Sequence, residues 1–110
     1  MSDQLTGVFA ALADPTRRAI YERLLESPIG LSATELANGA SVSRQAIVKH
    51  LQVLAKAGLA AASRDGRDVR YVASSDEALE ASSWLAERAS AWDRRIAALQ
   101  AQVRAAPRRD

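Results

Sequence analysis

The sequence predicts a mainly α-helical fold with one small β-hairpin. Alanine, glutamate and arginine are frequent, whereas the 110 residues include five glycines and three prolines, a composition that favours helices over sheets. Apolar residues recur at helical spacing near both ends of the chain. Two short segments with strand-like alternation flank the dipeptide Asp65-Gly66, which suits a tight hairpin turn. A chain of this length is expected to form a single domain with a modest core, spanning residues 1–106.

The first two predicted helices meet at residue 14. Apolar side chains at positions 5, 8, 9 and 12 follow the i, i+3, i+4, i+7 pattern and predict a helix over about residues 4–13. Asp14 and Pro15 are the residue types expected at an N-cap and a first helical position. They open a second helix whose predicted apolar face comprises Ile20, Leu24 and Leu25.

Residues 32–57 predict a helix-turn-helix unit. Ser32 followed three positions later by Glu35 is a capping-box pattern that starts a short third helix. Ser43 can cap a fourth helix, which Gly58 would end. The predicted unit therefore consists of two helices joined by a short turn.

A hairpin and a long helix complete the predicted fold. Residues 59–64 and 67–72 are expected to be strands joined by a two-residue type I′ turn at Asp65-Gly66, which makes residues 59–73 a wing. Ser75 is expected to cap a helix over residues 75–105, and residues 107–110 are expected to be a disordered tail. Five helices with this hairpin before the last one predict a winged helix-turn-helix.

One segment of the chain carries an excess of basic side chains. Residues 43–71 carry six basic and two acidic side chains, a net charge of +4, although the whole chain carries only +2. With Ile47 at the centre of the inward face of the fourth helix, long polar side chains lie on the opposite face. A recognition helix needs this arrangement, since Arg can pair with guanine and Gln with adenine in the major groove. The predicted DNA-binding residues are Ser43, Arg44, Gln45, Lys49, Gln52 and Arg67.

Other basic residues are assigned weaker roles. Arg64 and Arg70 remain for solvent or DNA, and basic side chains on an edge strand can serve only to prevent aggregation. Arg17 and Arg18 are expected to be structural or to lie near phosphates. His50, at the edge of the buried stripe of its helix, is expected to be a packing residue rather than a backbone contact.

The last helix carries a stripe that predicts a homodimer. Its apolar residues are spaced 4, 3, 4, 3, 4, the alternation of a coiled-coil seam. The first helix is expected to contribute to the same interface, and Trp84 to cover the body of the domain or, less favoured, to line an effector pocket. A two-fold axis would present two recognition helices to an inverted-repeat DNA site. The predicted interface residues are Leu5, Phe9, Leu12, Leu85, Ala89, Trp92, Ile96, Leu99 and Val103.

Several functional classes are disfavoured by the sequence. There is no cysteine, so disulfides, thiolate nucleophiles and cysteine metal sites are excluded. The N-terminal residues do not resemble a secretion signal and no stretch approaches 18 apolar residues, which predicts a soluble, cytoplasmic protein. No catalytic constellation is recognisable. We therefore expect no enzyme activity and no cofactor. A winged-helix module that binds another protein and not DNA is the alternative left open.

The motifs resemble the ArsR family of winged-helix repressors. The resemblance runs from Phe9 to about Ala73 through the strings FAALADPTRRAIYERLL, LSATELA, VSRQAIVKHLQVLAKAGL and RDGRDVRY. It implies a dimeric, autoregulating repressor that leaves its operator when an inducer binds. It also implies that Ser43, Arg44, Gln45, Lys49 and Gln52 read DNA, with Arg67 at the tip of the wing.

The chain departs from the resemblance at the positions used for metal sensing. Many members of the family hold a metal through cysteines of the third helix, at positions that correspond here to Ser32 and Thr34, or through ligands that include histidine in the last helix. Neither residue supplies a thiolate, and the last helix has no histidine. We therefore expect a branch that does not sense metals, with an organic ligand, a partner protein or its own concentration as the signal.

Overall fold

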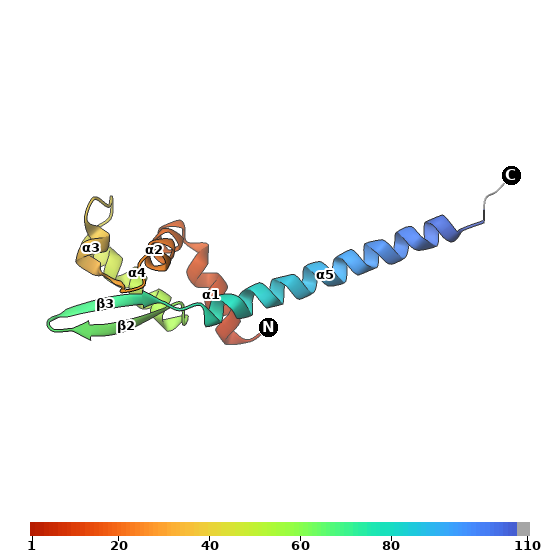
Figure 1. Cartoon of the computed structure of the whole chain (residues 1–110). Coiled ribbons are helices and arrows are strands. Elements are labelled where there is room, and N and C mark those ends of the chain that lie inside the picture. The colour runs from red at the N-terminus through yellow and green to blue at the C-terminus, as the bar shows by residue number, and fades with distance from the viewer. Residues whose placement is uncertain (108–110) are drawn as a thin grey trace.

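The computed structural model describes residues 1–107, except for the side chain of Asp65, and shows a small helical body from which one long helix projects (Figure 1). The predicted mainly α fold with a wing is confirmed, whereas residues 108–110 of the predicted tail lie outside the described residues. In chain order the elements are α1 (Asp3–Ala13), α2 (Pro15–Leu25), β1 (Leu31–Ser32), α3 (Ala33–Ala37), α4 (Arg44–Lys56), β2 (Ala60–Asp65), β3 (Asp68–Ala73) and α5 (Asp76–Ala105).

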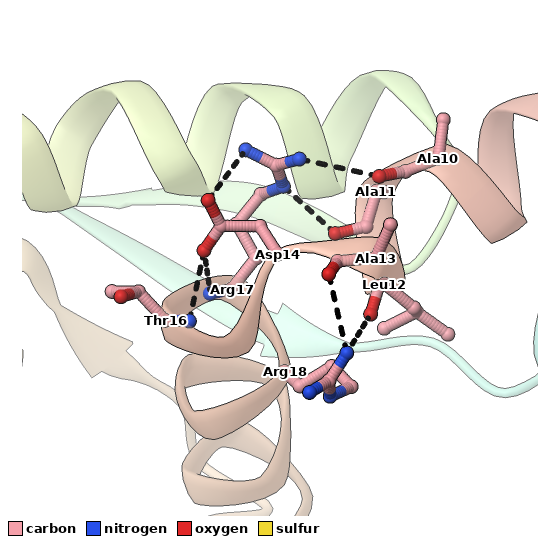
Figure 2. A network of polar contacts seen from close by, with 8 residues as sticks. All are labelled: Ala10, Ala11, Leu12, Ala13, Asp14, Thr16, Arg17 and Arg18. Atoms are coloured by element: carbon pink, nitrogen blue, oxygen red, sulfur yellow. Dashed lines mark hydrogen bonds and ion pairs between the residues drawn. The ribbon is translucent and has the colours of Figure 1, made fainter.

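Three side chains hold the sharp corner between α1 and α2: Asp14, which caps α2, and Arg17 and Arg18 in its first turn (Figure 2). Asp14 Oδ1 accepts the backbone N–H groups of Thr16 and Arg17 at 2.8 and 3.1 Å, so it caps α2 as predicted. The last carbonyl groups of α1 have no following turn to bond. Instead, Arg17 Nε donates to Ala11 O at 2.7 Å and Arg18 Nη1 donates to the carbonyl of residue 12 at 2.9 Å. These two arginines therefore have a structural role, which is one of the two roles expected from the sequence.

The cap at Asp14 makes stability depend on pH. The backbone N–H of Arg17, and then that of Thr16, hold the pKa of the Asp14 carboxyl below its ordinary value. A depressed pKa stabilises the fold above the ordinary pKa, and this contribution is lost as the pH falls through the depressed value. Asp14→Asn keeps a capping oxygen that does not titrate. We expect its melting temperature to fall less than that of the wild type between about pH 6 and about pH 3.

The control for this measurement is Glu22→Gln, which removes an exposed carboxyl group that caps no helix. Thermal melts followed by circular dichroism across the pH series give the comparison. An acid slope of Asp14→Asn equal to that of the wild type would contradict the assignment.

The helix-turn-helix begins and ends at the predicted caps. Ser32 Oγ accepts the backbone N–H of Glu35 at 3.1 Å and Glu35 Oε1 accepts that of Ser32 at 3.3 Å, which is the predicted capping box. Ser43 Oγ accepts the N–H of Ala46 and starts α4. Gly58, at φ +82°, ends α4 in a left-handed conformation that favours glycine. The ends of α3 and α4 are therefore set by local caps, as the sequence predicted.

The sheet contains one strand more than predicted. β1 comprises only two residues, which pair antiparallel with β3, Leu31 opposite Tyr71 and Ser32 opposite Arg70. The strand order is β1-β3-β2, so β3 is the central strand. A two-residue strand has too few side chains to show alternation, and only pairing with β3 defines it.

The hairpin turn lies one residue further along than predicted. Asp65 pairs with Asp68, which leaves Gly66 and Arg67 as the two turn residues. Within the described chain φ is positive at Gly66 (+64°) and at no residue other than glycine, whereas a type I′ turn needs positive φ at both central residues. The turn therefore fits type II′, with glycine in the first position. The expected type I′ turn at Asp65-Gly66 was wrong, because the glycine takes the first place of the turn rather than the second.

The core lies between the helices of the body and the sheet. Its largest fully buried side chains are Val8, Leu24, Leu36, Ile47, Leu51, Leu54 and Leu59. Leu25, predicted to face inward, is 52% exposed, and Tyr21 takes its place at 8% exposed. Burial raises the pKa of the Tyr21 hydroxyl, which donates to Ser74 O at 3.0 Å. Tyr21 thereby links α2 to the segment between the hairpin and α5.

Helix α5 runs far beyond the body (Figure 1). Its 30 residues span about 45 Å at about 1.5 Å per residue. The radius of gyration is 20.9 Å, against about 13 Å for a compact domain of this length. Within residues 1–107, the Ser75 side chain makes no capping hydrogen bond, so that predicted cap was wrong. No helix in the same range is long and apolar enough to span a bilayer.

Candidate nucleic-acid interface

Helix α4 presents a polar outer face because its inner face is fully engaged with the core. Ile47, Leu51 and Leu54 are at most 2% exposed, and they hold the helix against α2 and α3. The side chains on the outer face, Gln45, Lys49, Gln52 and Lys56, are exposed as the sequence predicted. Ser43 and Arg44 are exposed at the N-terminal end, and the Ser43 hydroxyl is also the helix cap. This amphipathic division is the one that a recognition helix requires.

A cleft joins α4 to the hairpin and brings three predicted DNA-binding residues together. Arg44 and Gln52 of α4 line one side, and Arg67 at the hairpin turn lines the other, around a volume of about 350 Å³. Thr34 of α3 lies in the wall of the same cleft. The structure therefore brings Arg44 and Gln52, which are 8 positions apart in the sequence, onto one surface with Arg67, which follows Gln52 by 15 positions.

One hairpin arginine is not free for solvent or DNA, contrary to the expectation from sequence. Arg70 Nη1 lies 3.0 Å from Glu35 Oε1, and its Nη2 donates to Gly30 O at 2.8 Å. Because β1 pairs with β3, the side chain of Arg70 lies over α3 instead of pointing outward. Arg64 and Arg67 are exposed.

The ionised form of Glu35 is stabilised by its surroundings. The backbone N–H of Ser32, then the Ser32 hydroxyl group and the Arg70 guanidinium, hold the pKa of Glu35 below its ordinary value. The carboxylate thus remains charged throughout the neutral and weakly acidic range. Its interactions with the cap of α3 and with β3 are therefore both present under these conditions.

The apolar stripe of α5 is exposed within a single chain. Leu85, Trp92, Leu99 and Val103 are 52%, 61%, 56% and 68% exposed, while Ala89 is exposed and Ile96 is partly exposed. Large apolar side chains exposed together on one projecting helix are typical of an interaction surface. The lone chain leaves nearly the whole predicted seam uncovered.

The α1 residues of the predicted dimer surface differ in how much of each side chain is exposed to a partner. Leu5 is 8% exposed and belongs to the chain's own core, so it has little surface left for a partner. Phe9 and Leu12 are partly buried against this core. Trp84 packs on the body as the sequence favoured, with its ring edge-to-face with Phe9 at a centroid separation of 5.8 Å. The guanidinium of Arg88 covers the Trp84 ring at 4.4 Å.

The positions that correspond to metal ligands in the resemblance have other roles in this structure. Ser32 is buried and caps α3, and the Thr34 hydroxyl accepts a hydrogen bond from Arg44 Nε at 3.0 Å. Residues 1–107 contain no cluster of three histidine, cysteine, aspartate or glutamate side chains able to hold a metal ion. His50 is partly buried on α4.

Sequence reasoning missed the contacts that α3 makes with Arg44 and Arg70. The Ser32 to Glu35 spacing identified the cap, and a carboxylate oxygen that accepts a backbone N–H can accept a second donor such as an arginine. Which arginine it would hold could not be deduced, because Arg70 is 35 positions away and reaches Glu35 only through β1–β3 pairing.

Comparison with known proteins gives a consistent result. A family model described as a helix-turn-helix domain matches residues 12–61. The solved structure of an ArsR-like transcriptional regulator from Rhodococcus sp. RHA1 is 39% identical, with a TM-score of 0.77 over 96% of this chain and 95% of that one. The HTH-type transcriptional regulator YuzN of Bacillus subtilis is 40% identical over 73 residues, which are 61% of this chain and 78% of that protein.

A third relative matches a shorter segment more strongly. The HTH-type transcriptional regulator Rv2034 of Mycobacterium tuberculosis is 53% identical over 49 residues. The match covers 44% of this chain and 44% of that protein, so the chain spans less than half of the length of this relative.

Proposed function

This chain belongs to the ArsR-like family of winged helix-turn-helix transcriptional regulators, and we propose that it is a dimeric repressor that binds an inverted-repeat operator. Members of this family are regulators of transcription and not enzymes. The observation that carries the proposal is the cleft in which Arg44, Gln52 and Arg67 meet. Helix α4 and the hairpin both direct basic or amide side chains into this cleft. Recognition of DNA uses such side chains to contact base edges in a groove and phosphates of the backbone.

The roles of the six residues follow from their positions. Arg44 and Gln45, in the first turn of α4, and Gln52, two turns later, are proposed to contact base edges in the major groove. Ser43 and Lys49 are proposed to bind phosphates beside them, where the N-terminal end of α4 also favours an anion. Arg67 at the tip of the hairpin is proposed to contact the phosphate backbone or the minor groove.

The test is a fluorescence titration of the full chain with double-stranded DNA from its own promoter at several salt concentrations. Binding should weaken as salt rises, since each neutralised phosphate contributes about −0.9 to the slope of log K against log salt. Arg67→Ala removes two contacts from a dimer, so its slope should be shallower by about 2. A chain that binds no DNA even at low salt would contradict the proposal and favour a protein-binding module.

Dimerisation through α5 is proposed from its uncovered stripe. A partner's α5 would bury Leu85, Trp92, Leu99 and their neighbours, with Phe9 and Leu12 of α1 at the edge of the interface. Because DNA-binding dimers place their recognition helices about 34–36 Å apart, the operator would contain two half-sites in inverted orientation. Repression, rather than activation, rests on the family resemblance.

We propose that regulation does not involve a metal, because of the residues that stand where many members of the family have metal-binding cysteines. Ser32 and Thr34 are occupied in capping α3 and in bonding Arg44, and neither offers the soft sulfur ligand that sensing of cadmium, zinc or arsenite commonly uses. We expect the affinity for operator DNA to change by less than about twofold when zinc or arsenite is added, a difference below about 0.4 kcal/mol. Release of DNA at micromolar metal, measured by the same titration, would overturn this proposal.

A further inference from the structure

Two adjacent residues of α3 each hold an arginine of a different DNA-facing element. Thr34 bonds Arg44, the first residue of α4, and Glu35 binds Arg70 of β3. Helix α3 has only five residues, and its side chains at these two positions lie between α4 and the hairpin. The inference drawn from this arrangement rests on the proposed function.

The contact to Arg44 engages one nitrogen and leaves the others available. Arg44 Nε donates to Thr34 Oγ1 at 3.0 Å, and in the part of the chain that the structure describes neither terminal Nη group makes a further hydrogen bond. Arginine reads guanine by two parallel hydrogen bonds to O6 and N7. A guanidinium held at Nε can still make both bonds, and holding it before DNA arrives reduces the rotamer freedom that must be lost on binding.

The contact to Arg70 anchors the hairpin. Arg70 joins the Glu35 carboxylate at 3.0 Å and the Gly30 carbonyl at 2.8 Å, and it lies three residues from the turn residue Arg67. The Glu35 oxygen that binds Arg70 also accepts the backbone N–H of Ser32. The same carboxylate thus connects the start of α3 with the central strand of the wing.

We propose that Thr34 and Glu35 are positioning residues for DNA recognition: Thr34 sets the direction of Arg44 toward its base, and Glu35, through Arg70, sets the hairpin that carries Arg67. Thr34 therefore affects the preference of the protein for one DNA base over another, whereas Glu35 affects how much the wing contributes to the affinity for DNA. Neither needs to contact DNA itself.

Thr34→Val and Thr34→Ser form a matched pair for the first part. Valine keeps the shape of threonine without the hydroxyl, and serine keeps the hydroxyl. Binding is measured for the operator and for operators in which each guanine is replaced in turn. Thr34→Val should reduce discrimination at the base read by Arg44 by about two- to tenfold, the cost of ordering one long side chain, and Thr34→Ser should preserve it.

The double variant distinguishes positioning from a direct contact. If Thr34 acts through Arg44, Thr34→Val should change nothing further in the Arg44→Ala background. A Thr34→Val protein that matches the wild type would overturn the inference. An equal loss on every DNA sequence, retained in the Arg44→Ala background, would also overturn it and would make Thr34 a phosphate contact.

Glu35→Gln tests the second part without destroying the helix cap, because glutamine also serves at this position of a capping box. Glu22→Gln is the control, since it removes the same charge from an exposed site on α2. Relative to this control, Glu35→Gln should lower affinity and make the additional effect of Arg67→Ala smaller. Equal behaviour of the two glutamine variants would overturn the role of Glu35.

The outcomes separate this inference from the proposed function. If the wild-type chain binds no DNA, both fail together. If Arg44→Ala and Arg67→Ala weaken recognition while Thr34→Val and Glu35→Gln leave it unchanged, the proposed function stands and only the positioning roles fail. Circular dichroism melts of every variant show whether a loss reflects unfolding.

Discussion

Trp92→Arg is expected to convert the dimer into monomers that no longer hold the operator. Trp92 is 61% exposed in the single chain, so its replacement should leave the folded body intact. In the proposed dimer the new guanidinium would be buried without a partner, and an unpaired buried charge is strongly unfavourable. Losing the second half-site removes the gain from bivalent binding, about 10²- to 10⁴-fold in affinity.

Sedimentation equilibrium and operator titration measure the two consequences separately. Ser90→Arg is the matched control, because residue 90 lies about 160° around the helix from Trp92 at about 100° per residue and is exposed. This control should remain a dimer and bind DNA. An intact dimer of Trp92→Arg would contradict the proposed seam, and a monomer that retained full operator affinity would contradict the need for two half-sites.

Arg44→Ala is expected to abolish preference at one base of each half-site. A bidentate arginine–guanine pair contributes about 1–3 kcal/mol of discrimination, which corresponds to about 5- to 150-fold between the correct and the substituted base. Arg44 is exposed and lies outside the core, so thermal stability should hardly change. The measurement is the ratio of affinities for the operator and for its single-base variants.

Arg44→Lys separates charge from geometry at this site. Lysine keeps the positive charge but lacks the planar fork, so overall affinity and its salt dependence should be largely retained while base preference falls. If Arg44→Ala changed affinity equally for every DNA sequence, Arg44 would be a phosphate contact and not a reader of bases.

The local signals in the sequence predicted the elements well because each depends on neighbouring residues. Asp14 with Pro15, the Ser32–Glu35 box, Ser43 and Gly58 act over three or four positions, and the structure shows each at the end of a helix. Ser75 failed, since a serine caps a helix only when its backbone is extended, and here it has φ −102° and ψ −14°.

Residues paired over long distances could not be predicted in the same way. The turn lies one residue further along than predicted because strand register is a property of both strands together. Arg70, expected to remain for solvent or DNA, binds Glu35 instead, because its direction depends on the two-residue strand β1, which the sequence pattern does not show. Tyr21 in place of Leu25 is a comparable case. On an isolated helix both lie near the apolar side, and only the position of the sheet decides which is buried.

The sequence by itself determined the five helices, the two strands of the hairpin, the polar outer face of α4 and the apolar stripe of α5, because these follow from periodicity and caps within one segment. Only the tertiary structure decided that Arg70 binds Glu35 while Arg67 is exposed, that Leu5 belongs to the chain's own core, and that Arg44 donates a hydrogen bond to Thr34. Each of these depends on which segments the fold brings within hydrogen-bond or packing distance. Thr34 and Arg44 are 10 positions apart, whereas Glu35 and Arg70 are 35 positions apart and meet through the pairing of β1 with β3.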